Sequence, residues 1–537
     1  MSKTALYLGL DLSTQQLKAV IIDDECNLVL SIAVNFDRDL SEFKTNDGVH
    51  RSENGEVVTS PVTLWLAAID KLFEQLAETL KDDLKRIKAI SGCGQQHGTV
   101  YWSALAEKRL QELRPNKVLK TLEGSFAREA CPIWMDSSTG VQCDRLETAV
   151  GGKENLAAIT GSRAYHRFSG SQIAKIAEDE AEVYEKTTKI SLVSSFVASI
   201  LVGRVVPIDL SDGSGMNLLN VNTRDWDFKC LQGCAPPGTD GQKFAQELSK
   251  KLGNPVATDS IIGSISHYFS ERYGLEKSCS VLAFTGDNPA SLAGLCADED
   301  SLVLSLGTSD TVFFSTPDPN FCLDGHIFVH PYRPNEFMGM ACFKNGSLTR
   351  ERVRKALGLE WDSIGEILNK TSAENDENLG FYYDLNEIAP PIKAGDYRFN
   401  EKSEQVNSFS PEVEIRAVLE SQFISKLVYA RRLGWKGNES LGRILVTGGA
   451  SENVSLLQLI ADVFHLPVYT ISVPHSAALG GALRARYGSS LTNVSSTPLH
   501  KILRKIEPQN VKDTYKKMAS RYDFLEEKLR KEHSYQD

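Results

Sequence analysis

Long hydrophobic runs and an excess of basic residues are both missing from this chain of 537 residues. No apolar run reaches the roughly 18 residues of a membrane-spanning helix, so we expect no such helix. The net charge of −11 argues against nucleic acid or an anionic membrane as the main partner. It does not argue against a phosphate-bearing small ligand, because backbone amides and a metal ion can hold phosphate locally.

Cysteine motifs are also missing, and we expect no targeting segment. The ten cysteines are scattered, and the closest pair, Cys230 and Cys234, has no second pair to complete a zinc site. The first predicted strand begins almost at the N-terminus, which leaves no room for a signal or transit peptide. We therefore expect reduced thiols and a cytoplasmic protein.

Two common nucleotide-binding motifs do not occur. The sequence G-x-x-x-x-G-K-[ST] is missing, which excludes a P-loop enzyme. Gly92, Gly94 and Gly98 have the wrong spacing for the dinucleotide fingerprint. A Rossmann-type oxidoreductase therefore has no support in this sequence.

One short hairpin pattern is present twice. Residues 8–14 turn into 17–22, and residues 302–308 turn into 311–314, each through an Asp/Ser-x-Gly/Ser-Thr turn between apolar strands. Such small turn residues leave backbone N–H groups and Thr hydroxyls available for an anion. A single hairpin of this kind is most simply an ordinary turn, but the pair favours a duplicated domain that holds a phosphate chain from both sides.

The two turns differ in one important residue. Asp11 stands in the first turn where Ser305 stands in the second. A carboxylate is a suitable ligand for a divalent metal ion, whereas a serine offers hydrogen bonds. We therefore expect the first turn to hold a metal ion and the second to contact phosphate only.

The order of strand and helix patterns predicts an α/β protein with more than one domain. A chain of this length is too long for one core. The pattern predicts helices over residues 61–84, 413–432 and 454–464, a loop over 211–215 and a charged helical tail over the last fifty residues. We place domains at residues 1–295 and 296–488, followed by a helical C-terminal tail at 489–537.

A third turn in the second half is rich in glycine. Residues 444–446 are a predicted strand, 447–453 the turn, and 454–464 a helix. Paired glycines let a ligand approach the backbone at a helix N-terminus. Ordinary strand-to-helix turns use glycine too, but the position after a phosphate hairpin favours a contact with adenosine.

Asp287 follows a predicted buried strand over residues 280–285, between Gly286 and Asn288. An acid has no packing purpose there. Transfer of a phosphoryl group to a hydroxyl needs a positioned acceptor for the proton, and this carboxylate is suited to that role. The alternative is a helix N-cap, which Asp often supplies, and position alone leaves both interpretations open.

His97 lies in a glycine-rich loop with Gln95 and Gln96, after a predicted strand over residues 87–90. Glutamine and histidine offer the directional hydrogen bonds that a polyhydroxylated sugar requires. A lone histidine is more often structural, but these neighbours favour a sugar contact. Local sequence leaves open whether Arg167 is only a solvated charge and whether Asp136 is only a cap.

Taken together and in this order, five motifs resemble the FGGY carbohydrate kinases, which have the actin-like, sugar kinase and heat-shock ATPase fold. The motifs are residues 9–16, 95–98, 286–288, 305–310 and 447–453. The resemblance covers about residues 5–485. Within the family, residues 11–16, 134–138 and 161–165 resemble the xylulose kinases of eukaryotes. The chain departs from the broader family at Ser137 and Ser138, where an arginine is usual, so no sugar role is assigned to Asp136.

The resemblance implies two actin-like (RNase H-like) α/β domains that flank a nucleotide and sugar cleft. Residues 1–295 would bind sugar and catalyse, and residues 296–488 would bind nucleotide. The implied activity is ATP-dependent phosphorylation of D-xylulose to D-xylulose 5-phosphate, which feeds the pentose phosphate pathway, with Mg²⁺ as a cofactor and no nucleic acid or membrane partner. The alternatives are a kinase for another ketopentose or related sugar, or an actin-like ATPase that acts as a chaperone or scaffold. A chaperone should add a β-rich peptide-binding unit, and none is predicted.

The resemblance also implies a role for individual residues. Asp287 would be the catalytic base, and Asp11 would organise Mg²⁺. The sugar would be bound by His97, Arg167, Asp287 and Asn288. The nucleotide would be bound by Thr14, Thr308, Trp361, Gly448, Gly449, Ala450 and Asn453.

Overall fold

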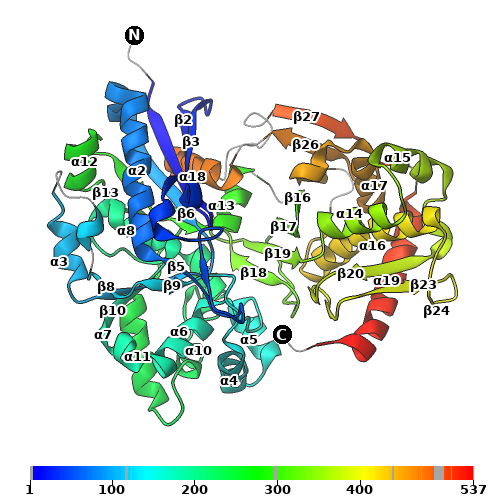
Figure 1. The fold of residues 1–537 in the computed structure, drawn as a ribbon, viewed down its shortest axis with the longest axis horizontal. Coiled ribbons are helices and arrows are strands. Elements are labelled where there is room, and N and C mark those ends of the chain that lie inside the picture. The colour runs from blue at the N-terminus through cyan, green and yellow to red at the C-terminus, as the bar shows by residue number, and fades with distance from the viewer. Residues whose placement is uncertain are drawn as a thin grey trace. The chain divides into compact units, whose positions relative to one another are not determined.

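The computed structural model describes residues 4–114, 119–122, 124–295, 297, 300–437, 441–472, 475–488, 501–509 and 511–535. The chain forms two compact units, whose elements are labelled in Figure 1. Unit 1 comprises Met1–Cys296, Phe328–Glu336 and Pro474–Leu499, and unit 2 comprises Ala297–Ile327, Phe337–Val473 and His500–Asp537. Two later segments of the chain thus return to unit 1, and the predicted boundaries at residues 295 and 488 stay a prediction.

A seven-stranded sheet forms the centre of unit 1. Its order is β13 (Ile261–Ser264), β14 (Ser280–Leu282), β6 (Ile87–Gly94), β1 (Leu6–Leu12), β2 (Gln16–Asp23) and β3 (Leu28–Asn35), and β15 (Thr285–Gly286) also pairs with β6. β1 is antiparallel to β2 and parallel to β6, which is parallel to β15. Leu12 therefore lies opposite Gly94, and Gly94 lies opposite Gly286. The ends of three strands, distant in sequence, meet at one edge of the sheet.

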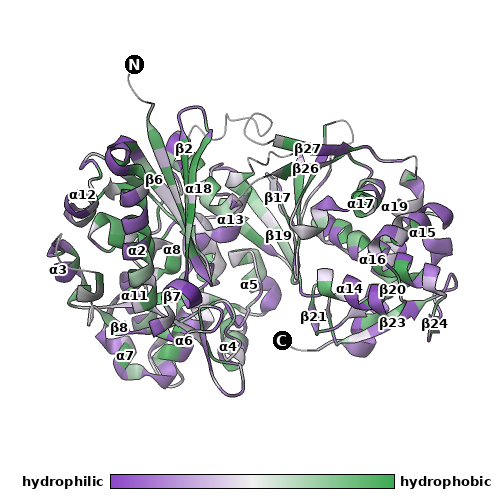
Figure 2. Cartoon of the chain, turned by 45° about the horizontal axis from the view of Figure 1, so that its top comes forward, coloured by the Kyte–Doolittle hydropathy of each residue, from purple (hydrophilic) through white to green (hydrophobic). Residues whose placement is uncertain are grey.

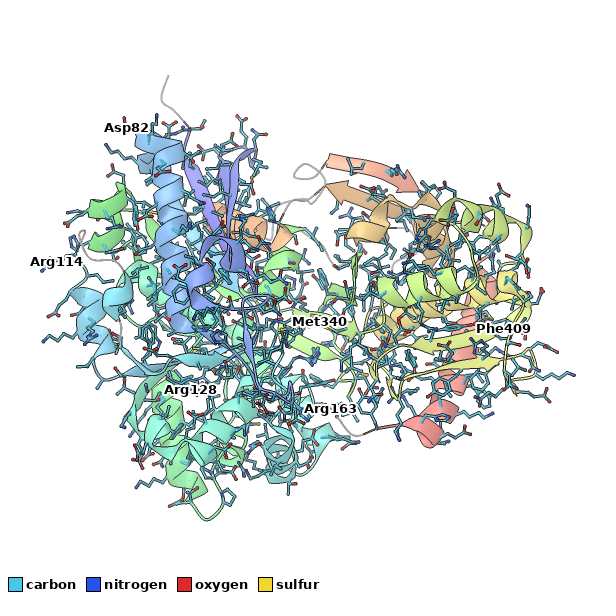
Figure 3. The ribbon with its side chains drawn as sticks, in the orientation of Figure 1. Asp82, Arg114, Arg128, Arg163, Met340 and Phe409 are labelled. Atoms are coloured by element: carbon cyan, nitrogen blue, oxygen red, sulfur yellow. The ribbon has the colours of Figure 1, made fainter. Side chains whose placement is uncertain are left out.

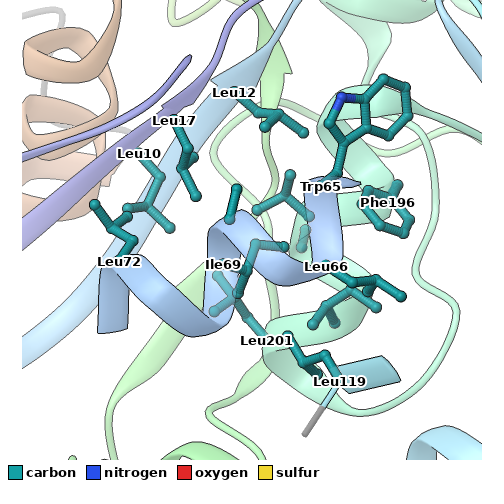
Figure 4. Packing of buried hydrophobic residues seen from close by; sticks show 14 of the residues in the cluster. Leu10, Leu12, Leu17, Trp65, Leu66, Ile69, Leu72, Leu119, Phe196 and Leu201 are labelled. Carbon is teal, nitrogen blue, oxygen red and sulfur yellow. The ribbon is translucent and has the colours of Figure 1, made fainter. Parts of the chain in front are cut away.

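Different helices cover the two faces of this sheet. Side chains alternate between the faces along a strand, so each strand contributes residues to both faces. Leu10 and Leu17 pack on the face covered by α2 (Val62–Leu80), where Leu66, Ile69 and Leu72 meet them (Figure 4). Each such leucine stabilises the fold by about 1.5–3 kcal/mol when fully buried. The predicted helix over residues 61–84 is confirmed as α2 followed by a short 3₁₀ helix, η2 (Lys81–Arg86).

On the opposite face, Val20 and Ile22 pack against α13 (Asp287–Gly294) and α18 (Ser476–Tyr487). The backbones of these two helices are in close contact. A β-carbon on Gly480 would therefore collide with the carbonyl of Ala290. Gly294 faces the carbonyl of Ser476 in the same way. The close contact holds the start of α18 against α13 at the sheet edge where β1 and β15 end.

A second core of unit 1 lies around α4 (Gly140–Val150), α6 (Ser169–Asp179), α10 (Phe228–Gly233) and α11 (Gly241–Leu252). It packs on a small sheet of β10 (Thr187–Leu192), β7 (Thr99–Ser103) and β8 (Phe126–Arg128). The loop predicted over residues 211–215 is wrong. The chain there forms α9 (Leu210–Gly213) and the 3₁₀ helix η4 (Ser214–Met216), because the Asp209 side chain caps α9 by accepting the Asp212 N–H at 2.9 Å.

Unit 2 contains another seven-stranded sheet. Its order is β18 (His326–Val329), β19 (Phe337–Phe343), β17 (Asp310–Thr316), β16 (Ser301–Leu306), β25 (Arg443–Thr447), β26 (Val468–Ser472) and β27 (Lys501–Ile506). β16 is antiparallel to β17 and parallel to β25, as β1 is to β2 and β6. The predicted repetition of the hairpin is therefore confirmed.

The helices of unit 2 pack on this sheet through α14 (Ser347–Ala356), α16 (Pro411–Arg432), α17 (Val454–Phe464) and α19 (Lys512–His533). The helices predicted over residues 413–432 and 454–464 are confirmed. The tail prediction is wrong over β27, which pairs with β26, and α19 buries Tyr515, Tyr522 and Leu525 in the core. Residues 489–500 of the predicted tail lie outside the described residues. Figure 2 shows that the strands of both sheets are largely hydrophobic.

Two expectations from composition can be compared with the described part of the chain. No helix there is both long and apolar enough to cross a membrane. The nine cysteines in the described ranges are free thiols.

Candidate functional site

A cavity of about 250 Å³ opens in unit 1 at the edge where β1 and β15 end. Three segments of the chain supply its lining. They are Asp11, Ser13 and Lys18 from the first hairpin, Asp287, Asn288 and Ser291 from α13, and His475, Ser476 and Ala477 at the start of α18. The structure therefore brings together three of the predicted site residues, Asp11, Asp287 and Asn288.

Asp11 is almost fully buried near the end of β1, with 3% of its surface exposed. The Lys18 Nζ lies 3.1 Å from Asp11 Oδ2, and the Cys93 thiol donates to Oδ1 at 3.5 Å. Lys18 is directly opposite Asp11 in the antiparallel pair, so both side chains project from the same face. Lys18 was missing from the predicted site, although the register of the hairpin was a signal that could have found it.

Asp287 is the first residue of α13, and Gly286 occupies the N-cap position. The alternative interpretation of Asp287 as the N-cap is therefore wrong. Its Oδ1 accepts hydrogen bonds from the Asn288 N–H at 2.8 Å and from Asn288 Nδ2 at 3.1 Å. Burial, with a further contribution from the charge of Asp11, raises the pKa of Asp287 to about 7. A carboxylate with this pKa is suited to accept a proton near neutral pH.

Gly286 has two polar side chains packed around it. A β-carbon at this position would lie 2.8 Å from Asp212 Oδ1 and 2.8 Å from Gln96 Cδ, so only glycine fits. Gln96 Oε1 accepts from Asn288 Nδ2 at 3.1 Å, and Asp212 Oδ2 accepts from the Ser194 hydroxyl at 2.5 Å. Burial raises the pKa of Asp212 well above its ordinary value. Asp212 was not among the predicted site residues, because the Ser-Asp-Gly pattern around it predicts a loop.

His97, the neighbour of Gln96 in the chain, is buried and has φ at +73°. Its Nδ1 lies 2.7 Å from the carbonyl of Gly215, and since a carbonyl only accepts, Nδ1 carries the proton and Nε2 is a hydrogen-bond acceptor. Burial, followed by the charge of Arg167, lowers the pKa of His97 to about 3, so the ring is neutral. The ring stacks on Phe168 at 4.2 Å.

The charge of Arg167 acts on the His97 ring, and the role of both residues in sugar binding stays a prediction. The Arg167 guanidinium is 4.7 Å from the centre of the Tyr165 ring, and that of Arg163, labelled in Figure 3, is 4.8 Å from the same ring. Stacking on an aromatic ring fixes the plane of a guanidinium and therefore the direction of its donors. His97 and Arg167 thus share Phe168 as a neighbour, since the Arg167 guanidinium lies 5.5 Å from the centre of that ring.

Thr14 lies in the turn of the first hairpin but does not line the cavity, where Ser13 is found instead. The Thr14 hydroxyl accepts a hydrogen bond from Trp134 Nε1 at 2.9 Å and donates to Gln95 Oε1 at 3.3 Å. Its proposed contact with phosphate stays a prediction.

The remaining nucleotide candidates lie in unit 2. Thr308 is exposed in the turn between β16 and β17, and Gly448 begins the turn after β25. Because Ser305 pairs with Thr447 in parallel strands, these two turns lie at the same edge of the sheet. Gly448 has φ at +91°, and a β-carbon there would collide with the carbonyl of Leu306.

Gly449 and Ala450 continue this turn as the 3₁₀ helix η6 (Gly449–Glu452), and Asn453 caps α17 by accepting the Leu456 N–H at 3.1 Å. Trp361 begins α15 (Trp361–Lys370) and is half-buried. Its Nε1 donates to Glu351 Oε2 at 3.1 Å. The roles of these residues in nucleotide binding stay predictions.

A metal ion at the cavity would need oxygen atoms from a bound ligand, in addition to protein side chains, to complete its coordination shell. Among the described residues, no group of three or more His, Cys, Asp and Glu side chains is arranged to hold a metal. Asp11 and Asp287 line the same cavity and supply hard oxygen atoms. Mg²⁺ in proteins is usually held by one or two carboxylates, with phosphate oxygens and water completing its shell. The residues present fit that arrangement.

Comparisons with known proteins show to which family the chain belongs. The models of the N-terminal and C-terminal domains of the FGGY family of carbohydrate kinases match residues 128–294 and 302–489. A protein of Rattus norvegicus named xylulose kinase is 47% identical over 483 residues, which cover 90% of this chain and 88% of that protein. The chain belongs to the FGGY family of carbohydrate kinases. The predicted enzyme class, a carbohydrate kinase, is confirmed, and the chaperone or scaffold alternative has no support.

Other FGGY relatives agree with this assignment. Xylulose kinase 2 of Arabidopsis thaliana is 43% identical over 500 residues, covering 90% of this chain and 87% of that protein. Among solved structures, a xylulose kinase from Rhodospirillum rubrum has a TM-score of 0.79 at 16% identity, with coverage of 98% and 99%. A glycerol kinase from Plasmodium falciparum has a TM-score of 0.72 at 15% identity, with coverage of 98% of both chains. The FGGY sugar kinase fold expected from the resemblance is confirmed.

Proposed function

We propose that this FGGY kinase transfers the γ-phosphoryl group of ATP to D-xylulose and forms D-xylulose 5-phosphate. The observation that carries the proposal is the joint lining of one cavity by Asp11 and Asp287, in a chain 47% identical to a protein named xylulose kinase. The proposed setting is the cytoplasm, where the thiols stay reduced.

Asp287 is the proposed catalytic base. The sugar hydroxyl oxygen forms a bond to the γ-phosphorus, the bond from that phosphorus to the bridging oxygen breaks, and ADP leaves. The hydroxyl proton moves to the Asp287 carboxylate. Because Oδ1 already accepts two hydrogen bonds from Asn288, we assign the proton to Oδ2.

Neutral polar groups and one cation would recognise the sugar. His97 Nε2 accepts a hydrogen bond from a sugar hydroxyl, since Nδ1 is held by the Gly215 carbonyl. Arg167 supplies donors, and the Asn288 amide oxygen supplies an acceptor, because Gln96 and Asp287 accept the two hydrogens of its Nδ2. This arrangement suits an uncharged polyol chain that both donates and accepts hydrogen bonds.

The nucleotide is assigned to two regions of the chain. Thr308 and Thr14 would approach the phosphates, and Gly448, Gly449, Ala450 and Asn453 would meet the adenosine, with Trp361 nearby. Asp11 would hold Mg²⁺ together with phosphate oxygens, and the bound ion would neutralise charge on the transferred group. Lys18 keeps the Asp11 carboxylate oriented toward the cavity through its contact at 3.1 Å.

The substrate assignment can be tested by measuring ADP release with a panel of ketoses and polyols at saturating ATP and Mg²⁺. D-Xylulose should give a kcat/KM at least about tenfold above D-ribulose, L-ribulose and glycerol, because unpaired polar groups in the site penalise the wrong hydroxyl pattern. The position of the phosphate in the product is read by NMR. A higher kcat/KM for another sugar would overturn the substrate and leave the kinase assignment intact.

A further inference from the structure

A buried ionic cluster contacts the turn between β16 and β17 (residues 307–309), which is the proposed phosphate contact of unit 2. Asp310, the first residue of β17, is fully buried. Its carboxylate receives two hydrogen bonds from Arg350 of α14, at 2.8 and 3.3 Å, and Lys426 Nζ of α16 lies 2.9 Å from its Oδ2. Arg350 and Lys426 are each 1% exposed. Three elements of the unit thus converge on one carboxylate.

The same carboxylate holds the backbone of the turn. Asp310 Oδ1 accepts the N–H of Gly307 at 3.2 Å. The start of α14 binds the turn from the other side, since Gly346 N–H donates to Thr308 O at 3.1 Å and Ser347 N–H donates to Gly307 O at 2.8 Å. A β-carbon on Gly346 would lie 2.7 Å from both carbonyls, which shows how closely α14 approaches the turn.

These contacts decide which groups of the turn can reach a ligand. The Gly307 N–H and the carbonyls of Gly307 and Thr308 are already used within the protein. Thr308 and Ser309 are exposed at the tip of the turn. Burial would raise the pKa of Asp310, but Lys426 and Arg350 outweigh it and hold the pKa below its ordinary value. Asp310 therefore stays ionised and fully committed to its internal partners, so it is no metal ligand.

We propose that Asp310, anchored by Arg350 and Lys426, is a positioning residue that holds the turn in the one conformation in which Thr308 and Ser309 meet the phosphates of the nucleotide. This inference rests on the proposed function, because it takes the turn to be a phosphate contact. It adds Ser309 as a proposed binding residue. It also gives a reason for the buried cluster of Asp310, Arg350 and Lys426, which has no catalytic role of its own. A buried ion pair is weak evidence of stabilisation, whereas a carboxylate that fixes a turn has a specific structural task.

The test compares Asp310→Asn with a matched variant on the same unit, Glu420→Gln. Glu420 is 0% exposed and accepts from Arg416 of α16 at 2.8 Å and from Tyr515 of α19 at 2.7 Å, so it is a buried, ion-paired carboxylate held by residues outside the turn. Binding of a non-hydrolysable ATP analogue and of adenosine is measured by calorimetry on the full chain. Asp310→Asn should weaken the analogue about tenfold, the effect of roughly one lost hydrogen bond, and leave adenosine unchanged. Glu420→Gln should change neither affinity.

Lys426→Met keeps the test decisive if Asp310→Asn does not fold. It removes one of the contacts to Asp310 while the paired hydrogen bonds from Arg350 remain, so a loss of about threefold for the analogue is expected. Lys426→Arg should restore most of the affinity. Unchanged binding of the analogue by the folded variants, or an equal loss for adenosine, would overturn the positioning role. Failure of the unsubstituted protein to bind the analogue would instead overturn the proposed function on which the inference rests.

Discussion

Replacing Asp287 with asparagine removes the proposed proton acceptor and keeps the size of the side chain. The rate of phosphoryl transfer should fall roughly 10²–10⁴-fold, the usual cost of a lost general base. Affinity for a non-hydrolysable ATP analogue should stay close to normal, because the adenosine candidates lie in unit 2 and Asp287 lies in unit 1.

The same substitution should stabilise the folded protein at alkaline pH. Burial and the charge of Asp11 raise the pKa of Asp287 from 3.8 to about 7. Between these values the folded state keeps a proton that the unfolded state has released, so this contribution to stability is complete below pH 3.8 and is lost as the pH rises through about 7. At about 1.36 kcal/mol per pKa unit, a rise from 3.8 to about 7 costs the unsubstituted protein about 4 kcal/mol at pH 8. Asp287→Asn, which is neutral at every pH, avoids this cost.

Urea unfolding at pH 5 and pH 8, with EDTA present to keep divalent ions from the cavity, measures this difference. The advantage of Asp287→Asn over the unsubstituted protein should be larger at pH 8 than at pH 5. Asp240→Asn is the control, since Asp240 is an exposed N-cap of α11 and asparagine is an equally good cap. Its effect should stay within about 0.5 kcal/mol at both pH values. An advantage independent of pH, or near-normal turnover, would refute the reasoning.

Two further substitutions distinguish the proposed role in metal binding from the proposed role in sugar binding. Asp11→Asn should raise the Mg²⁺ concentration for half-maximal rate at least about tenfold and change sugar affinity little; an unchanged magnesium titration would move the metal role to another residue. His97→Ala should raise KM for the sugar about tenfold, because the Nε2 acceptor is lost while ATP-analogue affinity is retained; an altered affinity for the analogue with an unchanged KM for the sugar would contradict the sugar contact.

The sequence by itself determined the local elements whose signals are contained in a few neighbouring residues. Alternating apolar residues and small turn residues predict both hairpins, and the structure pairs β1 with β2 and β16 with β17. The helix over residues 454–464 has the predicted bounds, because its apolar pattern and the capping residue Asn453 lie next to each other in the chain. The motifs that carry the family resemblance are also local, which is why they identified the fold and the enzyme class.

The tertiary structure alone decided which of these local features share a site. Asp11 and Asp287 meet because β1, β6 and β15 are parallel neighbours, and strand pairing between distant segments leaves no local signal. Asp212 reached Gly286 through α9, whose sequence suggested a loop, since the buried cap from Asp209 outweighs the low helix propensity of Ser, Asp and Gly. Lys426 and Arg350 lie on two helices that are distant in sequence, and only packing buries both against Asp310. Burial and pairing depend on contacts between residues far apart in the chain, so propensity and spacing predict the elements but not the chemistry that forms where they meet.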